Sequence, residues 1–199
     1  MSNEASTTLN SPAWGDPAPL GLSGFALTTL VLSVSNAGLV KEAGAGILVL
    51  GLAAFYGGMA QFVAGVVEFR RGNTFGATAF GSFGAFWLSE WWIDTHLTAA
   101  SGDIHQATGL LLVGWAIFTG FMTVGALKTS YAVLAVFAAL TLTFLFLALG
   151  AFQNGVQPDS LTKVGGYLGI VTGLLAWYAA AATVINSTHK RELLPTWPQ

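Results

Sequence analysis

The sequence predicts an all-α integral membrane protein, with six transmembrane helices packed through small residues into one bundle. Charge and hydropathy are the first observation: 8% of the residues are charged, 54% are hydrophobic, and the mean hydropathy is +0.67. A soluble domain usually carries about 25% charged residues. The second observation is a series of six long runs without charge, and the third is the heavy use of glycine, at 25 residues.

Each run is about as long as the helix that crosses a bilayer, which needs roughly 20 residues. The predicted spans cover residues 20–40, 43–67, 74–89, 109–127, 131–152 and 164–186. Strands of a membrane barrel would alternate apolar and polar residues over about ten positions. These runs are continuous, and a helix satisfies its own backbone groups within lipid.

The chain shows no linker or change in composition, so we predict one transmembrane domain, 20–186. It lies between an N-terminal segment, 1–19, and a C-terminal tail, 187–199. With six spans, the termini share a side with five cations, namely Arg70, Arg71, Lys128, Lys190 and Arg191, whereas the other side has Lys41 and Lys163. Cytoplasmic loops carry the excess of Lys and Arg. We therefore expect a multi-pass protein of the plasma membrane with both termini cytoplasmic.

Glycines recur at helical spacing in two of the spans. Gly44, Gly51, Gly58 and Gly65 are seven residues apart, which predicts a single seam on the second span, and Gly165, Gly169 and Gly173 are four apart on the sixth. Small residues allow close helix approach in lipid. The pattern fits packing within one chain or an interface between copies.

Several classes of function lack their residues. No basic stripe runs through the sequence, so we expect no nucleic-acid partner. Cysteine is absent, and the three histidines are too scattered for a metal site. No span offers a catalytic base, and no phosphate-binding loop is present, so we expect neither an enzyme nor a cofactor. Glu68 and Glu90 stand near the ends of spans, where we expect them at the lipid interface.

Neutral polar residues inside the spans are the remaining candidates for a solute path. Most serines and threonines could simply satisfy their own backbone. The amides of Asn36 and Gln61 have more groups to satisfy and are harder to explain in that way. At the start of the first span, Asp16 and the following prolines predict the N-cap and first turn of a helix. The free N–H groups of such a first turn would favour a nearby anion.

Two stretches carry a resemblance to a known family. Residues 16–25 read Asp-Pro-Ala-Pro-Leu-Gly-Leu-Ser-Gly-Phe, and residues 55–68 read Phe-Tyr-Gly-Gly-Met-Ala-Gln-Phe-Val-Ala-Gly-Val-Val-Glu, with Gly72–Phe80 and Phe86–Leu88 agreeing. They resemble the acetate uptake transporter family, which includes the succinate–acetate permeases. The resemblance covers essentially the whole chain.

The resemblance implies a ring-shaped homohexamer in which each protomer holds its own path for acetate and, in some members, succinate. By position, Phe25, Phe83 and Leu140 match the apolar constriction of that path. Phe83 stands where the family usually has Tyr, and Asp16 where Asn is commoner. Around this path, Thr28, Asn36, Gln61 and Ser82 are our candidates for substrate contacts.

The sequence therefore predicts transport of acetate and related short carboxylates through a lipid bilayer, as an anion channel or a proton symporter. A carboxylate is almost wholly ionised at neutral pH, and hydrocarbon excludes the charged form. A channel for another small solute, such as ammonium, and a non-transporting membrane sensor remain the alternatives.

Overall fold

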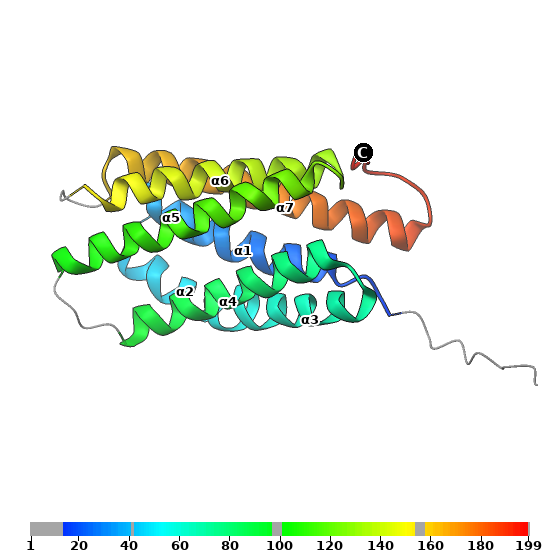
Figure 1. Ribbon diagram of the computed structural model, residues 1–199, viewed down its shortest axis with the longest axis horizontal. Helices are drawn as coiled ribbons and strands as arrows, with labels where there is room; N and C mark the ends of the chain where they lie inside the picture. The colour runs from blue at the N-terminus through cyan, green and yellow to red at the C-terminus, as the bar shows by residue number, and fades with distance from the viewer. Residues whose placement is uncertain (1–13, 41, 97–100, 154–157, 199) are drawn as a thin grey trace, which may run out of the picture.

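The computed structural model describes residues 14–40, 42–96, 101–153 and 158–198, so residues 1–13 of the predicted N-terminal segment lie outside it. Within these ranges the chain forms six helical rods (Figure 1). They are α1 (Ala18–Asn36), a continuous rod of α2 (Glu42–Ala54), the π-helix η1 (Phe55–Ala60) and α3 (Gln61–Arg71), then α4 (Thr74–His96), α5 (Ser101–Ala126), α6 (Tyr131–Ala151) and α7 (Ser160–His189). The all-α class is confirmed.

Five rods are long and apolar enough to cross a membrane: α1, Gly46–Arg71, Ile104–Ala126, α6 and α7. The remaining rod, α4, has 23 residues and is about 35 Å long, which also exceeds a bilayer core. Its glycines, hydroxyl side chains and Glu90 lower its mean hydropathy. Length and packing therefore group α4 with the other rods, although its composition is less apolar.

Several helices are longer than the apolar runs that predicted them. α4 continues past Glu90 to His96, and α5 begins at Ser101, whereas the predicted spans end at residue 89 and begin at residue 109. The polar residues there mark where the helix leaves the lipid for water, but they do not interrupt the helix. True ends occur at turn residues, as at the left-handed Gly72 after α3.

α1 is the central rod of the bundle, as Figure 1 shows. It packs most extensively against α7, which packs against α6, and α6 against α5; on its other side α1 contacts η1, α3 and α4. The contact between α4 and α5 is the weakest of these pairs. Rings of α4 and α5 span that junction, with Phe83 lying 5.6 Å from Trp115 between ring centroids.

Glycines of α7 allow its close contact with α1. A Cβ at Gly166 would strike the backbone of Ala37, and a Cβ at Gly173 would lie 3.0 Å from the Ala26 carbonyl oxygen. Close backbone contact replaces the hydrophobic drive that is missing between helices in lipid. The glycines of the sixth predicted span thus pack within the chain.

The prediction of a single glycine seam on the second span is wrong. Gly58 packs against Leu88 and Gly65 against the backbone of Gly81, whereas Gly44 and Gly51 have nothing within 4 Å. The π-helix η1 lies between the two pairs, and its i→i+5 hydrogen bonds place more residues in each turn. The seven-residue spacing therefore does not keep all four glycines on one face.

The C-terminal tail folds back against the start of α6. The N–H of Tyr131 donates to the carbonyl of Trp197 at 3.0 Å, and the N–H of Ala132 donates to that of Thr196 at 3.3 Å. The hydroxyl of Tyr178 donates to the Pro195 carbonyl at 2.6 Å. These bonds satisfy N–H groups that a helix start leaves free.

Candidate functional site

Two cavities lie end to end between α1, α4 and α6. We name them the Glu68 cavity, of about 220 Å³, and the Glu90 cavity, of about 400 Å³. The Glu68 cavity is lined by the early part of each helix, at Ala18, Leu22, Gly76, Phe80, Val133 and Phe137. The Glu90 cavity is lined by the later part, at Ser33, Asn36, Trp87, Glu90, Leu147 and Ala151. The three helices thus pass from one cavity to the other.

The passage between the cavities is apolar. Phe25 and Leu140 line both cavities, and Phe83 lines the Glu68 cavity beside them. The three side chains are 5%, 4% and 3% exposed, respectively, so little open surface remains there. The ring of Phe83 lies 5.7 Å from that of Phe25 and 6.2 Å from that of Phe137, between centroids. The structure therefore brings the three predicted constriction residues together.

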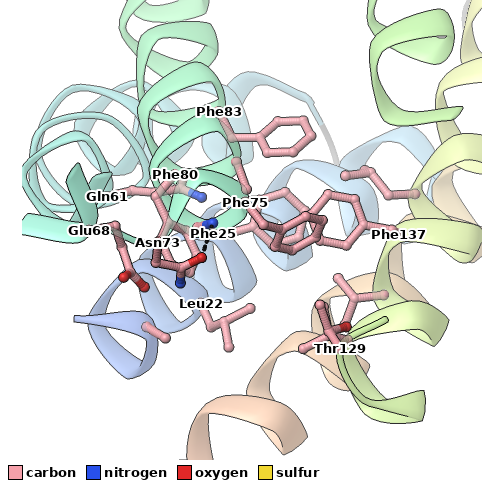
Figure 2. Close-up of a pocket in the computed structure, with 16 residues that line it drawn as sticks. Leu22, Phe25, Gln61, Glu68, Asn73, Phe75, Phe80, Phe83, Thr129 and Phe137 are labelled. Atoms are coloured by element: carbon pink, nitrogen blue, oxygen red, sulfur yellow. Dashed lines mark hydrogen bonds between the residues drawn. The ribbon is translucent and has the colours of Figure 1, made fainter. Parts of the chain in front are cut away.

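Glu68 is buried, which corrects our expectation that it lies at the lipid interface. Its side chain is 1% exposed and lines the Glu68 cavity, with Asn73 beside it and Thr129 on the far side (Figure 2). A Cβ at Gly76 would lie 2.7 Å from Glu68 Oε1, so the glycine leaves room for the carboxylate against the first turn of α4. Asn73 caps that turn by accepting the Gly76 N–H at 3.0 Å.

Arg71, at the end of α3, connects this helix to the segment before α1. Its Nη1 donates to the carbonyls of Trp14 at 2.6 Å and Gly15 at 3.0 Å. Its Nε lies 3.9 Å from Glu68 Oε2, too far for a hydrogen bond. The N-cap of α1 is Pro17 and not Asp16 as predicted, although Asp16 Oδ1 accepts the Ala18 N–H at 3.1 Å. Arg71 thus donates its hydrogen bonds to backbone carbonyls and not to Glu68.

Gln61 and Asn36 are the predicted contact residues that line the cavities. Gln61 follows η1 directly, is 1% exposed and points into the Glu68 cavity (Figure 2). Its Oε1 finds no hydrogen-bond partner within the described part of the chain. Asn36, at the end of α1, lines the Glu90 cavity. The two amides therefore lie on opposite sides of the apolar passage.

Thr28 and Ser82 lie outside both cavities. The hydroxyl of Thr28 donates to the Gly24 carbonyl at 2.8 Å, and its side chain packs against Gly57 of η1. Ser82 lines a shallow surface depression with Trp115 and Phe118, at the weak junction of α4 and α5. The arrangement of these two hydroxyls suits helix packing better than solute contact.

The Glu90 cavity contains polar groups besides the predicted contact residues, among them Glu90, which we expected at the lipid interface. Thr29 and Trp87 both line it, and neither Thr29 Oγ1 nor Trp87 Nε1 has a hydrogen-bond partner among residues 14–40, 42–96, 101–153 and 158–198. Glu90 and His105 line the same cavity, from α4 and α5. The periodicity of an almost uniformly apolar helix gives no signal for which residues face inward.

Comparison with known proteins agrees with this arrangement. The family model described as the GPR1/FUN34/yaaH family matches residues 2–198. The succinate-acetate/proton symporter SatP of Escherichia coli (strain K12) is 38% identical, over 90% of this chain and 94% of its own length. Acetate permease A of Emericella nidulans is 40% identical over 92% of this chain, which spans 65% of that longer protein.

A solved structure gives the same result in three dimensions. The structure of the bacterial acetate channel SatP superposes with a TM-score of 0.83 at 37% identity, over 92% of this chain and 99% of that one. The likeness therefore extends over nearly the whole chain. With its long apolar helices, this multi-pass membrane chain belongs to the GPR1/FUN34/yaaH family.

Proposed function

We propose that this protein transports acetate and related short carboxylates, succinate among them, across the membrane. The observation that carries the proposal is the pair of cavities that meet at Phe25 and Leu140. Cavities in series, joined at one apolar point, make a path for a solute through the bundle of a single chain. The names of the relatives, an acetate permease and a succinate-acetate symporter, support the substrate class.

In this proposal Phe25, Phe83 and Leu140 form the constriction, and Gln61 and Asn36 contact the substrate on either side of it. Apolar side chains at a narrow point exclude water and therefore oppose the passage of hydrated ions. Amide N–H groups can donate to a carboxylate before it enters and after it leaves. Passage then depends on how much hydration the solute must lose.

The proposed protein spans the plasma membrane six times, with both termini cytoplasmic, and assembles as a homohexamer. The length of α4 supports the sixth span. The open space beside Gly44 and Gly51, next to the exposed side chains of Ile47 and Leu48, supports a subunit contact on α2. Native mass spectrometry in detergent is expected to give six copies; a monomer at all concentrations would contradict this.

Uptake of labelled acetate into vesicles that contain the purified protein tests the proposed function. We expect uptake far above that of protein-free vesicles, with competition by unlabelled acetate and succinate. Protein-free vesicles are essential because neutral acetic acid crosses lipid by itself. Uptake that equals theirs would contradict the proposal, and competition by ammonium instead of succinate would favour a different solute.

A further inference from the structure

We propose that Glu68 makes carboxylate passage electroneutral: the Glu68 cavity accepts a carboxylate anion only when the Glu68 side chain holds a proton. The inference rests on the proposed function and deepens it, because it names the group that links the substrate to a proton. It follows from the position of Glu68 in a cavity meant for an anion, where an ionised carboxylate is otherwise unfavourable.

The first argument is the burial of Glu68 in the cavity wall. The side chain is 1% exposed, and Oε2 has no hydrogen-bond partner among the described residues. A buried carboxylate oxygen without a donor is costly when ionised. Such a group is well suited to take up a proton.

The second argument is the charge around the cavity. Glu68 is the sole ionisable side chain among the described residues that line it. Arg71, 3.9 Å away, and the acidic Asp16 are the charged groups that act on it electrostatically. The N-terminus of α4, beside Gly76, adds a partial positive charge. An ionised Glu68 would compete with an incoming anion for Arg71 and this helix end.

These two arguments determine the order of events. A proton from the aqueous phase binds the Glu68 carboxylate, and the resulting carboxyl O–H donates to an incoming acetate. The O–H bond of Glu68 breaks as that of acetic acid forms, and the neutral acid crosses the apolar passage at Phe25 and Leu140. Glu68 is left ionised, so one proton moves with each monocarboxylate and no net charge crosses.

Membrane voltage at equal pH on both sides separates this scheme from anion conduction. We would measure labelled acetate in vesicles under a potassium diffusion potential set with valinomycin, inside positive. The wild type is expected to take up acetate at the same initial rate with and without the potential. Glu68→Gln, which is neutral and of the same shape, is expected to pass the free anion, so its initial rate of uptake should rise with a potential of about 100 mV. Initial rates are compared because neutral acetic acid leaks back through the lipid and dissipates any accumulation.

Glu192→Gln is the matched control, because it makes the same exchange at an exposed residue of the tail and should behave as the wild type. If Glu68→Gln does not fold, Glu68→Ala carries the same expectation with a smaller neutral side chain. An initial rate that rises with the potential in the wild type, or one that does not in a transporting Glu68 variant, would overturn the inference. Absence of any wild-type transport would instead overturn the proposed function.

Discussion

Phe25 occupies the position on α1 where one cavity gives way to the other. Its ring contacts Phe83 at 5.7 Å between centroids and is 5% exposed. Both cavities reach it, so its size sets the width of the passage more directly than that of any residue lining one cavity alone. A smaller side chain there changes the passage without altering the polar groups of either cavity.

Phe25→Leu is therefore expected to relax size selectivity while keeping the site apolar. The ratio of butyrate to acetate uptake in vesicles should rise several-fold. Leucine is the better choice because truncating a buried phenylalanine to alanine costs about 3–5 kcal/mol of stability. Phe55→Leu, at a ring that is 69% exposed, is the control. An unchanged ratio would remove Phe25 from the constriction.

The sequence could predict part of the candidate site. The family resemblance pointed to Phe25, Phe83 and Leu140, which the structure brings together. Gln61 and Asn36 were predicted because a buried amide has several hydrogen-bonding groups to satisfy. Glu68 was misjudged because it stands at the end of an apolar run, beside Arg70 and Arg71, as an interfacial residue would. Its burial depends on α4 folding back over it at Gly76, and sequence spacing contains no information on that contact.

At the scale of elements, the packing of α3 against α4 depends on backbone contact. A Cβ on Gly65 would strike the backbone of Gly81, and one on Gly84 would lie 2.6 Å from the Phe62 nitrogen. Backbone atoms cannot yield as the end of a flexible side chain can. The two helices that hold Glu68 and Phe83 are therefore positioned by glycine.

Gly65→Ala is expected to destabilise the protein and to lower its midpoint of thermal unfolding in detergent, because overpacking costs about 1–3 kcal/mol. Gly114→Ala is the matched control, since its Cβ meets nothing within 4 Å and alanine favours a helix by about 1 kcal/mol. Equal midpoints for the two variants would show that α3 and α4 can move apart without loss of stability.

Element existence was easier to predict than element detail. Uncharged runs predicted all the rods, since a long apolar segment in lipid must be helical. Their ends were predicted less well, because Ser101 and His96 extend helices with polar residues. The regular spacing of the glycines did not indicate the π-helix η1. This π-helix nevertheless determines which of the glycines are buried.

For the whole molecule, the distribution of cations predicts its orientation in the membrane. The chain has no cysteine, so single cysteines can report each side without background. Thr95, at the far end of α4, and Ser187, near the end of α7, are both exposed and lie on opposite sides of the proposed topology. Three predicted spans, α5, α6 and α7, separate the two positions, and an odd number of spans must place them on opposite sides.

In intact cells, an impermeant maleimide is expected to label Thr95→Cys and to spare Ser187→Cys. Both variants should react after the cells are permeabilised, which serves as the control for reactivity. Labelling of Ser187→Cys alone would reverse the orientation. Labelling of both in intact cells would rule out the odd number of spans that the proposed topology places between the two sites.

The tail bonds to Tyr131 and Ala132 also impose an order on biosynthesis. The ribosome makes α6 well before residues 196 and 197, whose carbonyls accept the N–H groups at the start of that helix. These donors gain their partners only after residues 196 and 197 have been made, on the side of the membrane where α6 begins in the proposed topology. The start of α6 is therefore completed by residues that are made more than sixty positions after it.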